Sequence, residues 1–350
     1  MSEQLSFSYD QLMEFFVPVE EKFGLTAEQA RIMADSMIFA QSRGFASHGV
    51  IRLPLYMTKV EKGLINMKAE MPFTMEQGAV AAMDAQNCFG QLAGYKANEK
   101  AIELARKYGI SHVTVANSNH FGTGAWYSMR AADQGMVGIN LSNASPAMPP
   151  FGAREPILGT NPVGVAIPCG KKHKPIVLDM ALSVVARGKI RVYEVNGKKV
   201  PIGWGVDAEG KDTDDPTAIL KGGALCPVGG VKGSAMAFIV DLLCGVMTKT
   251  GLTGDTKGIT DMSGTSYTAH TFTCIDISKF IDLDEFGAMA DECVDRLKAL
   301  TPVQPGGTIY MAGEIEYGLM DKYAKEGIPV DVPIVNQLND LARKVGCATL

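Results

Sequence analysis

The chain has 350 residues, of which 46% are hydrophobic, so it is long enough for one large or two ordinary domains with a filled core. Its net charge of -5 argues against a concentrated nucleic-acid-binding surface, and a long uncharged run, 134–153, contains three prolines and therefore predicts no membrane span. The seven cysteines form no Cys-x-x-Cys pair and no N-terminal signal pattern precedes them, which indicates reduced thiols in the cytoplasm. The five histidines lack metal-ligand spacing, so we expect no metal.

The first seventy residues are predicted to be helical. Apolar residues recur at helical spacing over 9–23, 27–42 and 51–62. Thr26 and Gln29 have the spacing of a capping box for the second of these helices, and Arg43-Gly44 fits its end.

From about residue 79 the pattern alternates between strands and helices, which is typical of a layered α/β domain. The expected strands cover 80–83, 113–116, 137–141, 163–167, 176–180 and 272–277, and the expected helices cover 91–108, 125–134 and, as a buried helix, 234–247. Helical character returns from a cap at Asp282 or Asp284 to residue 300, and again over 334–345. We therefore expect an α/β domain over 71–282, and helical segments 1–70 and 283–350 that pack together.

The stretch 43–52, Arg-Gly-Phe-Ala-Ser-His-Gly-Val-Ile-Arg, is the most informative part of the chain. His48 can exchange a proton near neutral pH, and Arg52 is a permanent two-pronged cation for a carboxylate. If a helix begins near Gly49, Arg52 and Tyr56 follow His48 by one and two turns on the same side. The alternative is a helix-capping histidine beside a solvated arginine.

A second histidine, His120, lies in the sequence Asn-Ser-Asn-His-Phe-Gly, directly after the strand predicted at 113–116. Ligand-facing residues commonly follow strands in α/β architectures, and this imidazole could polarise a substrate carbonyl. The alternative is a loop histidine that bonds to its Asn and Ser neighbours.

The segment 142–162 is long, irregular and rich in Pro, Gly and small hydroxyl residues, which favours a binding surface. The expected ligand contacts in it are Asn143, Ser145, Thr160 and Asn161. The alternative is a rigid crossover in which Asn161-Pro162 makes a turn.

Lys232 and Gly233 lie in Gly-Gly-Val-Lys-Gly-Ser, at the predicted start of a helix. Glycine-rich backbone and a lysine at a helix N-terminus suit phosphate oxygens, whereas the alternative is a mobile surface turn. A Gly-x-Gly-x-x-Gly dinucleotide fingerprint is absent from the sequence.

Taken in chain order, these motifs resemble the type-2 malate/L-lactate dehydrogenase family over nearly the whole chain. The matching pieces are Ser47-His48-Gly49 with Arg52, Asn119-His120-Phe121-Gly122, Met148-Pro149-Pro150-Phe151-Gly152, Gly159-Thr160-Asn161-Pro162, Asp179-Met180-Ala181, Ala186-Arg187-Gly188-Lys189, Lys232-Gly233 and Gly313-Glu314. Ala144 stands where some relatives have a small hydroxyl residue, and Ser234-Ala235 replace a common aromatic.

The resemblance implies an NAD(P)-dependent oxidoreductase with a non-Rossmann α/β domain, a mixed sheet and a homodimer whose site lies near the subunit interface. It implies that His48 exchanges the proton, that His120 is the second catalytic or orienting histidine, and that Arg52 anchors a carboxylate. Further expected substrate contacts are Ser47, Tyr56 and Thr160. The expected cofactor contacts are Asn143, Ser145, Asn161, Asp179, Met180, Ala181, Lys232, Gly233, Gly313 and Glu314.

The substrate expected from this resemblance is a small 2-hydroxy or 2-oxo acid of the malate, lactate, sulfolactate or ureidoglycolate type, reduced or oxidised at C2. A reductase of a sugar-derived diketo acid or a cyclic 2-imino acid would use the same residues. A hydrolase using Ser47 is disfavoured because adjacent Ser47 and His48 cannot readily face one another. A non-catalytic anion-binding protein stays open, and between the two nucleotides we favour NAD over NADP.

Overall fold

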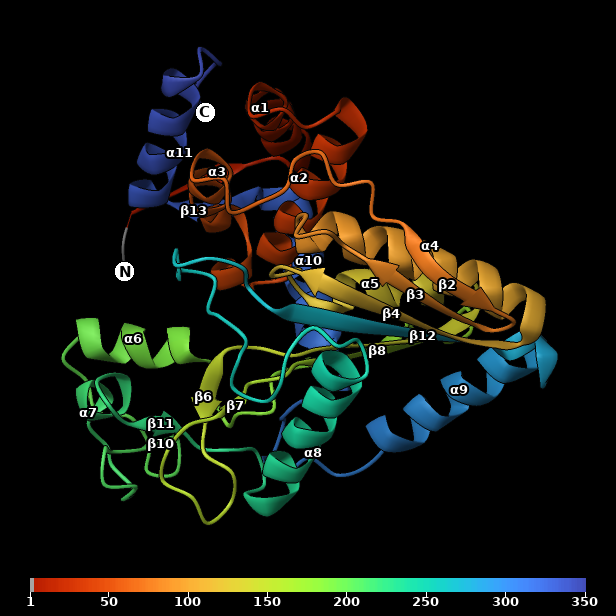
Figure 1. Cartoon of the computed structure of the whole chain (residues 1–350). Coiled ribbons are helices and arrows are strands. Elements are labelled where there is room, and N and C mark those ends of the chain that lie inside the picture. The colour runs from red at the N-terminus through yellow and green to blue at the C-terminus, as the bar shows by residue number, and fades with distance from the viewer. Residues whose placement is uncertain (1–2) are drawn as a thin grey trace.

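The computed structural model describes residues 3–350, and within them it contains a seven-stranded mixed sheet with helices on both faces (Figure 1). The strand order is β2-β3-β4-β12-β5-β8-β9, in which only the β3–β4 pair is parallel. Helices α4 and α5 pack on one face, and α8 with its continuation η3 lies on the other. The α/β class and mixed sheet predicted from the sequence are confirmed.

The helices of more than one turn have the following bounds: α1 Tyr9–Lys22, α2 Ala27–Ser42, α3 Leu53–Glu61, α4 Gly90–Tyr108, α5 Gly124–Ala132, α6 Arg187–Val195, α7 Pro216–Leu220, α8 Val231–Asp241, α9 Leu283–Lys298, α10 Glu314–Glu326 and α11 Val332–Lys344. Short 3₁₀ turns form η1 Ala46–His48, η2 Val50–Arg52 and η4 Ile277–Lys279, and η3 Leu242–Val246 is a π-helical turn.

The strands of the main sheet are β2 Phe73–Gln77, β3 Val80–Asp84, β4 Ile110–Ser118, β5 Met136–Ser142, β8 Val163–Ile167, β9 Ile176–Met180 and β12 Thr268–Asp276. Three two-stranded sheets complete the set: β1 Gln4–Phe7 with β13 Ile328–Asp331, β6 Pro146–Met148 with β7 Leu158–Gly159, and β10 Gly205–Val206 with β11 Ala224–Leu225.

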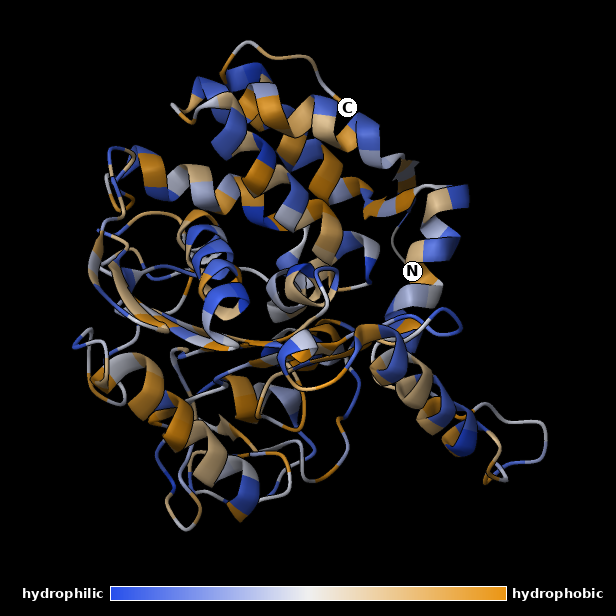
Figure 2. Ribbon diagram, turned by 90° about the vertical axis from the view of Figure 1, so that its right-hand side faces the viewer, coloured by the Kyte–Doolittle hydropathy of each residue, from blue (hydrophilic) through white to orange (hydrophobic). Residues whose placement is uncertain are grey.

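The two ends of the chain meet on one side of the sheet. Strand β1 pairs antiparallel with β13, α11 packs on α3, and α10 packs on α2. In contrast, α9 contacts η4, and the carboxylate of its Asp291 accepts three backbone N–H bonds from residues 170–173. Figure 2 shows hydrophobic residues recurring along one side of the helices and along the strands, as expected for elements that share a core.

The prediction that a helix begins near Gly49 is wrong. His48 lies in η1 and Arg52 in η2, and α3 begins only at Leu53, with Pro54 in its first turn. Gly49 has an extended ψ of -147°, and a Cβ there would lie 2.2 Å from the side-chain oxygen of Gln41. Close packing against α2 therefore interrupts the helix and gives the His48 loop its shape.

The prediction that the helix over 234–247 is buried is also wrong. Helix α8 with η3 covers this stretch, but several of its apolar side chains remain largely exposed: Met236, Phe238, Ile239, Leu242, Val246 and Met247. Its buried side, which includes Val240 and Cys244, packs on the sheet, so only one face of this apolar helix is covered within the chain. The sequence did not predict β1, β2, β13, α6 or α10.

None of the helices within residues 3–350 combines the length and the apolar character needed to cross a bilayer.

Candidate active site

The two candidate histidines, predicted from separate motifs, face each other across the loops that follow α2 and β4. The rings of His48 and His120 are stacked, with centroids 5.3 Å apart and planes inclined by 25°. Both line a cavity of about 170 Å³. The fold thus brings together two groups that lie far apart in the sequence, which is the arrangement expected of an acid-base site.

His120 is held in one tautomer by its neighbours. Its Nδ1 accepts the backbone N–H of Gly122 at 3.4 Å, and the hydroxyl of Tyr56 lies 2.8 Å from the same nitrogen. Gln91 donates to the Tyr56 oxygen at 2.7 Å, which leaves the phenol proton for Nδ1. The ring proton of His120 is therefore on Nε2, which has no hydrogen-bond partner among residues 3–350 and can donate to a ligand in the cavity.

Both histidines are neutral in the ligand-free site. Burial lowers the pKa of His48 to about 4, with a further contribution from the positive charge of Arg52. Burial also holds the pKa of His120 well below its usual value, reinforced by His48 and Arg52. Burial raises the pKa of Tyr56 to about 12, so its phenol stays protonated and can donate. An anion placed beside Arg52 would offset the charge that disfavours imidazolium, so substrate binding would raise the pKa of His48.

Arg52 and Ser47 form the outer edge of this site. The Arg52 Nε donates to the backbone oxygen of Ser47 at 2.5 Å. The Ser47 hydroxyl lies 3.0 Å from Nδ1 of His48, so the expectation that these two adjacent side chains cannot readily face one another is wrong. The terminal guanidinium nitrogens of Arg52 make no hydrogen bond to any described residue. Arg52 does not line the cavity itself, but its electrostatic effect on His48 places its charge nearby. The start of α6 lies close to Ser47, because a Cβ on Gly188 would be 3.9 Å from the Cβ of Ser47.

Three of the predicted residues in 142–162 line the cavity, and the fourth supports it. Asn143, Ser145 and Thr160 are in the wall, but the Asn143 side chain is already bonded, accepting from the backbone of Ala269 at 2.7 Å and donating to Thr256 at 2.9 Å. Asn161 is fully buried and lies outside the cavity lining.

The side chain of Asn161 ties the cavity wall to α8. It accepts the backbone N–H of Ala144 at 2.8 Å and donates to Asp241 at 2.9 Å, with a left-handed φ of +35°. Asparagine tolerates that conformation better than most residues do. This geometry makes Asn161 a positioning residue for the wall.

The Asp179-Met180-Ala181 segment covers the end of the edge strand β9 and the residue after it, and none of the three residues lines the cavity. The Asp179 carboxylate accepts the backbone N–H of Ala125 at 2.8 Å, where it caps α5, and burial raises its pKa to about 6. The backbone N–H of Leu182 donates to the backbone oxygen of Thr160 at 2.7 Å, so the end of this segment adjoins the cavity wall.

Lys232 opens α8, as predicted, beyond Gly229 and Gly230, whose φ values are +62° and +60°. Its side chain is exposed and makes no hydrogen bond or ion pair with any residue from 3 to 350. Gly233 is buried, and a Cβ there would lie 2.2 Å from the backbone oxygen of Val228. The backbone of Val228 in turn donates to Leu182 at 2.9 Å, which joins this loop to the end of β9.

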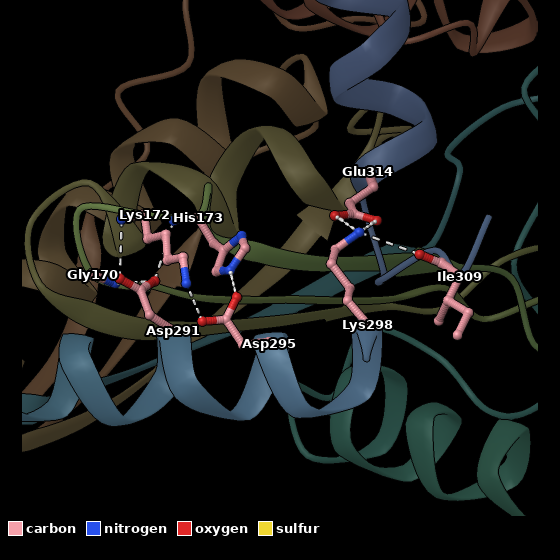
Figure 3. A network of polar contacts seen from close by, with 8 residues as sticks. All are labelled: Gly170, Lys172, His173, Asp291, Asp295, Lys298, Ile309 and Glu314. Atoms are coloured by element: carbon pink, nitrogen blue, oxygen red, sulfur yellow. Dashed lines mark hydrogen bonds and ion pairs between the residues drawn. The ribbon is translucent and has the colours of Figure 1, made fainter. Parts of the chain in front are cut away.

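Gly313 and Glu314 lie at the other end of β9. The backbone oxygen of Ala312 accepts from Val177 at 3.0 Å, and Gly313 has a left-handed φ of +91°. Figure 3 shows Glu314 facing Lys298 of α9, at 2.7 Å. Although partial burial opposes it, this ion pair keeps the pKa of Glu314 below its usual value. Neither residue lines the cavity of His48 and His120.

The structure adds four residues that the sequence reasoning missed. Lys59 and Lys257 line the cavity, Gln91 supports Tyr56, and the buried His270 bonds to Ser118 and Ser142 at the ends of β4 and β5. Lys59 had a readable signal, because it follows Tyr56 by three residues on the same side of a helix. Gln91 and His270 had none, since their partners lie more than thirty positions away in the sequence, and nothing local marked Lys257 as part of the wall.

Comparison with known proteins agrees with this architecture. The malate/L-lactate dehydrogenase family pattern matches residues 7–339. A malate dehydrogenase of Pyrococcus abyssi is 38% identical over 344 residues, covering 96% of this chain and 94% of the relative. A Pseudomonas putida reductase of Δ¹-pyrroline-2-carboxylate and Δ¹-piperideine-2-carboxylate is 32% identical and covers 95% and 96%. The structure of sulfolactate dehydrogenase from Methanocaldococcus jannaschii superimposes with a TM-score of 0.92 at 35% identity, covering 98% of both chains.

The chain belongs to the malate/L-lactate dehydrogenase family, and it is an oxidoreductase. The resemblance drawn from its ordered motifs is confirmed.

Proposed function

We propose that this enzyme transfers a hydride between a nicotinamide cofactor and C2 of a small 2-hydroxy or 2-oxo acid. The observation that carries the proposal is the cavity itself: two stacked histidines line it, no Asp or Glu among residues 3–350 does, and Arg52 lies beside it. A site with protonatable rings and only positive charge suits a carbonyl or hydroxyl group next to a carboxylate.

The chain's own residues bind, orient and protonate the acid. Arg52 holds the carboxylate through its free terminal nitrogens, and the Nε2–H of His120 donates a hydrogen bond to the oxygen on C2 without giving up its proton. In the direction of reduction the nicotinamide supplies the hydride to C2. His48, charged once the bound carboxylate offsets Arg52, gives its proton to the oxygen and becomes neutral. In the direction of oxidation neutral His48 takes that proton back.

The dinucleotide would lie between the cavity wall and the start of α8, within the α/β domain that we propose for residues 71–282. Lys232 provides a cation with no protein partner among residues 3–350, and Gly229 and Gly230 shape the turn before it. Ser145, Thr160 and the backbone of Met180 and Ala181 are further groups that would hold it. The side chains of Asn143, Asn161 and Asp179 are committed to protein atoms, and we assign them positioning roles.

We favour NAD over NADP as the nucleotide. Among the lysines at 171, 172 and 174, two are paired with carboxylates, Lys172 with Asp295 and Lys174 with Asp321. Paired lysines are poorer partners for a 2′-phosphate than free ones. All seven cysteines are free thiols, which suits the cytoplasmic location that we propose.

We further propose that the enzyme is a homodimer, with the exposed apolar face of α8 and η3 as part of the interface. Phe238 and Ile239 are 47% and 53% exposed. Large apolar side chains that are exposed together often mark a protein–protein interface. An Ile239→Glu variant should be monomeric in light-scattering measurements, and a wild-type chain that is monomeric at all concentrations would contradict the proposal.

The proposed reaction is tested by following nicotinamide absorbance with NADH and NADPH in turn. The acids to be compared are pyruvate, oxaloacetate, sulfopyruvate, oxalurate, 2,3-diketogulonate and a cyclic imine. We expect turnover of a 2-oxo acid with NADH. Turnover of the imine alone would favour the imino-acid reductase alternative, in which His48 protonates nitrogen, and binding of acids without any absorbance change would refute the oxidoreductase chemistry proposed for this cavity.

A further inference from the structure

The cavity contains a buried cation for which the residue roles above give no task. Lys59 of α3 is only 4% exposed, and it lines the same cavity as His48 and His120. Within residues 3–350 its ammonium group makes no hydrogen bond and no carboxylate lies within salt-bridge distance of it. A buried charge without a partner is costly, so it is kept only where something compensates it.

The surroundings of Lys59 compensate its charge only weakly. Burial lowers the pKa of Lys59, and Asp261, outside the cavity lining, offsets this only in part. The second lysine in the wall, Lys257, is half-buried and donates to the hydroxyl of Ser263 at 2.9 Å. The cavity therefore has two positive groups and no negative one among the described residues.

The position of Lys59 sets it apart from the carboxylate anchor. Arg52, Tyr56 and Lys59 follow one another at spacings of four and three residues along η2 and α3, so they lie on one side of this segment. Seven residues of helix span about 10 Å, with Tyr56 and its partner His120 in between. A small acid whose carboxylate binds Arg52 and whose C2 oxygen lies near His120 would point its other end toward Lys59.

We propose that Lys59 is a specificity-determining residue that binds a second acidic group of the substrate, a carboxylate or sulfonate on C3. The inference rests on the proposed function and names its substrate class: 2-oxo and 2-hydroxy acids with two negative charges. Such an acid compensates both Arg52 and Lys59. An acid with one charge leaves Lys59 buried and unpaired, so the site discriminates against it.

The test compares oxaloacetate with 2-oxobutyrate, in which a methyl group replaces the distal carboxylate. Wild-type enzyme should prefer oxaloacetate, and Lys59→Met should lower kcat/KM for oxaloacetate by roughly 10- to 100-fold, the value of a charge-assisted hydrogen bond, while 2-oxobutyrate is unaffected. Lys59→Arg should keep the preference. The matched control is Lys62→Met, which removes an exposed lysine at the end of the same helix and should change neither acid.

Calorimetric binding of L-malate and 2-hydroxybutyrate, without nucleotide, gives a second measurement that does not depend on turnover. Wild type should bind malate more tightly, and Lys59→Met should remove the difference. If Lys59→Met lost affinity for both acids equally, Lys59 would have only a structural role. If the variant instead had a raised KM for NADH and kept the preference for malate, Lys59 would bind an anionic group of the cofactor. Either result overturns the inference. If no acid is reduced, the proposed function fails, and the malate preference in the binding measurement then decides on Lys59 separately.

Discussion

The cavity and the polar network that joins α9 to residues 170–173 and to α10 both contain clustered charges, but these charges find partners in different ways. In the network, Lys172 and His173 bind Asp295, Lys298 binds Glu314, and Asp291 accepts three backbone N–H groups (Figure 3). In and beside the cavity, Lys59 and the terminal nitrogens of Arg52 have no hydrogen-bond partner among residues 3–350, and both histidines are kept neutral.

This difference separates charges that hold the chain together from charges that await a ligand. Paired groups have little left to offer an incoming molecule, whereas unpaired buried groups gain most from one. Substitutions in the network should therefore change stability, and substitutions in the cavity should change turnover.

The largest effect is expected for His48→Gln. The amide cannot exchange the proton, so kcat for 2-oxo acid reduction should fall by about 10²- to 10⁴-fold with little change in melting temperature. Steady-state kinetics and a thermal unfolding curve on the same preparation measure both quantities. Retained kcat would remove His48 from the proton transfer.

Arg52→Ala should lower kcat/KM for the acid by roughly 100-fold, and Arg52→Lys, which keeps the charge but loses the fork, by roughly tenfold. The KM for the acid should account for much of the loss, and the KM for nucleotide should not change. If both variants keep wild-type kcat/KM, the carboxylate anchor is elsewhere.

The opposite pattern is expected for Asp291→Ala in the network. Three backbone donors at 170–173 lose their acceptor, which should destabilise the fold by about 2–3 kcal/mol. Denaturant unfolding measures this, and kcat/KM of the folded fraction should equal that of wild type. Reduced turnover without loss of stability would break the contrast between the two regions.

The pH profile sharpens the assignment of charge in the cavity. Because the pKa of His48 is lowered to about 4, the ring is neutral at higher pH. For reduction, which needs imidazolium, kcat/KM should fall as pH rises between about 5 and 8, whereas oxidation should stay level there and fall only toward acid pH. Arg52→Gln removes a cation, so both profiles should move to higher pH. Unmoved profiles would show that another group titrates.

The smallest effect is expected for Lys298→Met, which breaks the partly exposed pair with Glu314. Such pairs add little, so the melting temperature should change by about 2 °C or less, and kcat/KM for the acid by less than about twofold. A raised KM for nucleotide alone would support a cofactor contact at Glu314. A large loss of acid turnover would instead couple the two regions.

The residues of the site could be predicted from the sequence only as separate groups. The order of motifs indicated the family, and strand and helix periodicity located β8, β9 and α2 to the residue. His48 and His120 were each candidates, but each had an ordinary alternative as a capping or loop histidine. Asn161 and Asp179 were expected to touch cofactor, yet the structure commits their side chains to Ala144, Asp241 and Ala125.

What the sequence alone determined is local: most of the main helices and strands, the cap of α2 at Thr26 and that of α9 at Asp282 or Asp284, and which residue types are able to carry protons or anions. Only the tertiary structure decided that Gly49 interrupts a helix, that β12 inserts between β4 and β5, and that Lys59 is buried without a hydrogen bond or ion pair to any residue from 3 to 350. The physical reason is that capping and periodicity depend on residues three or four positions apart, whereas burial and charge compensation depend on partners that the chain brings together from anywhere along its length.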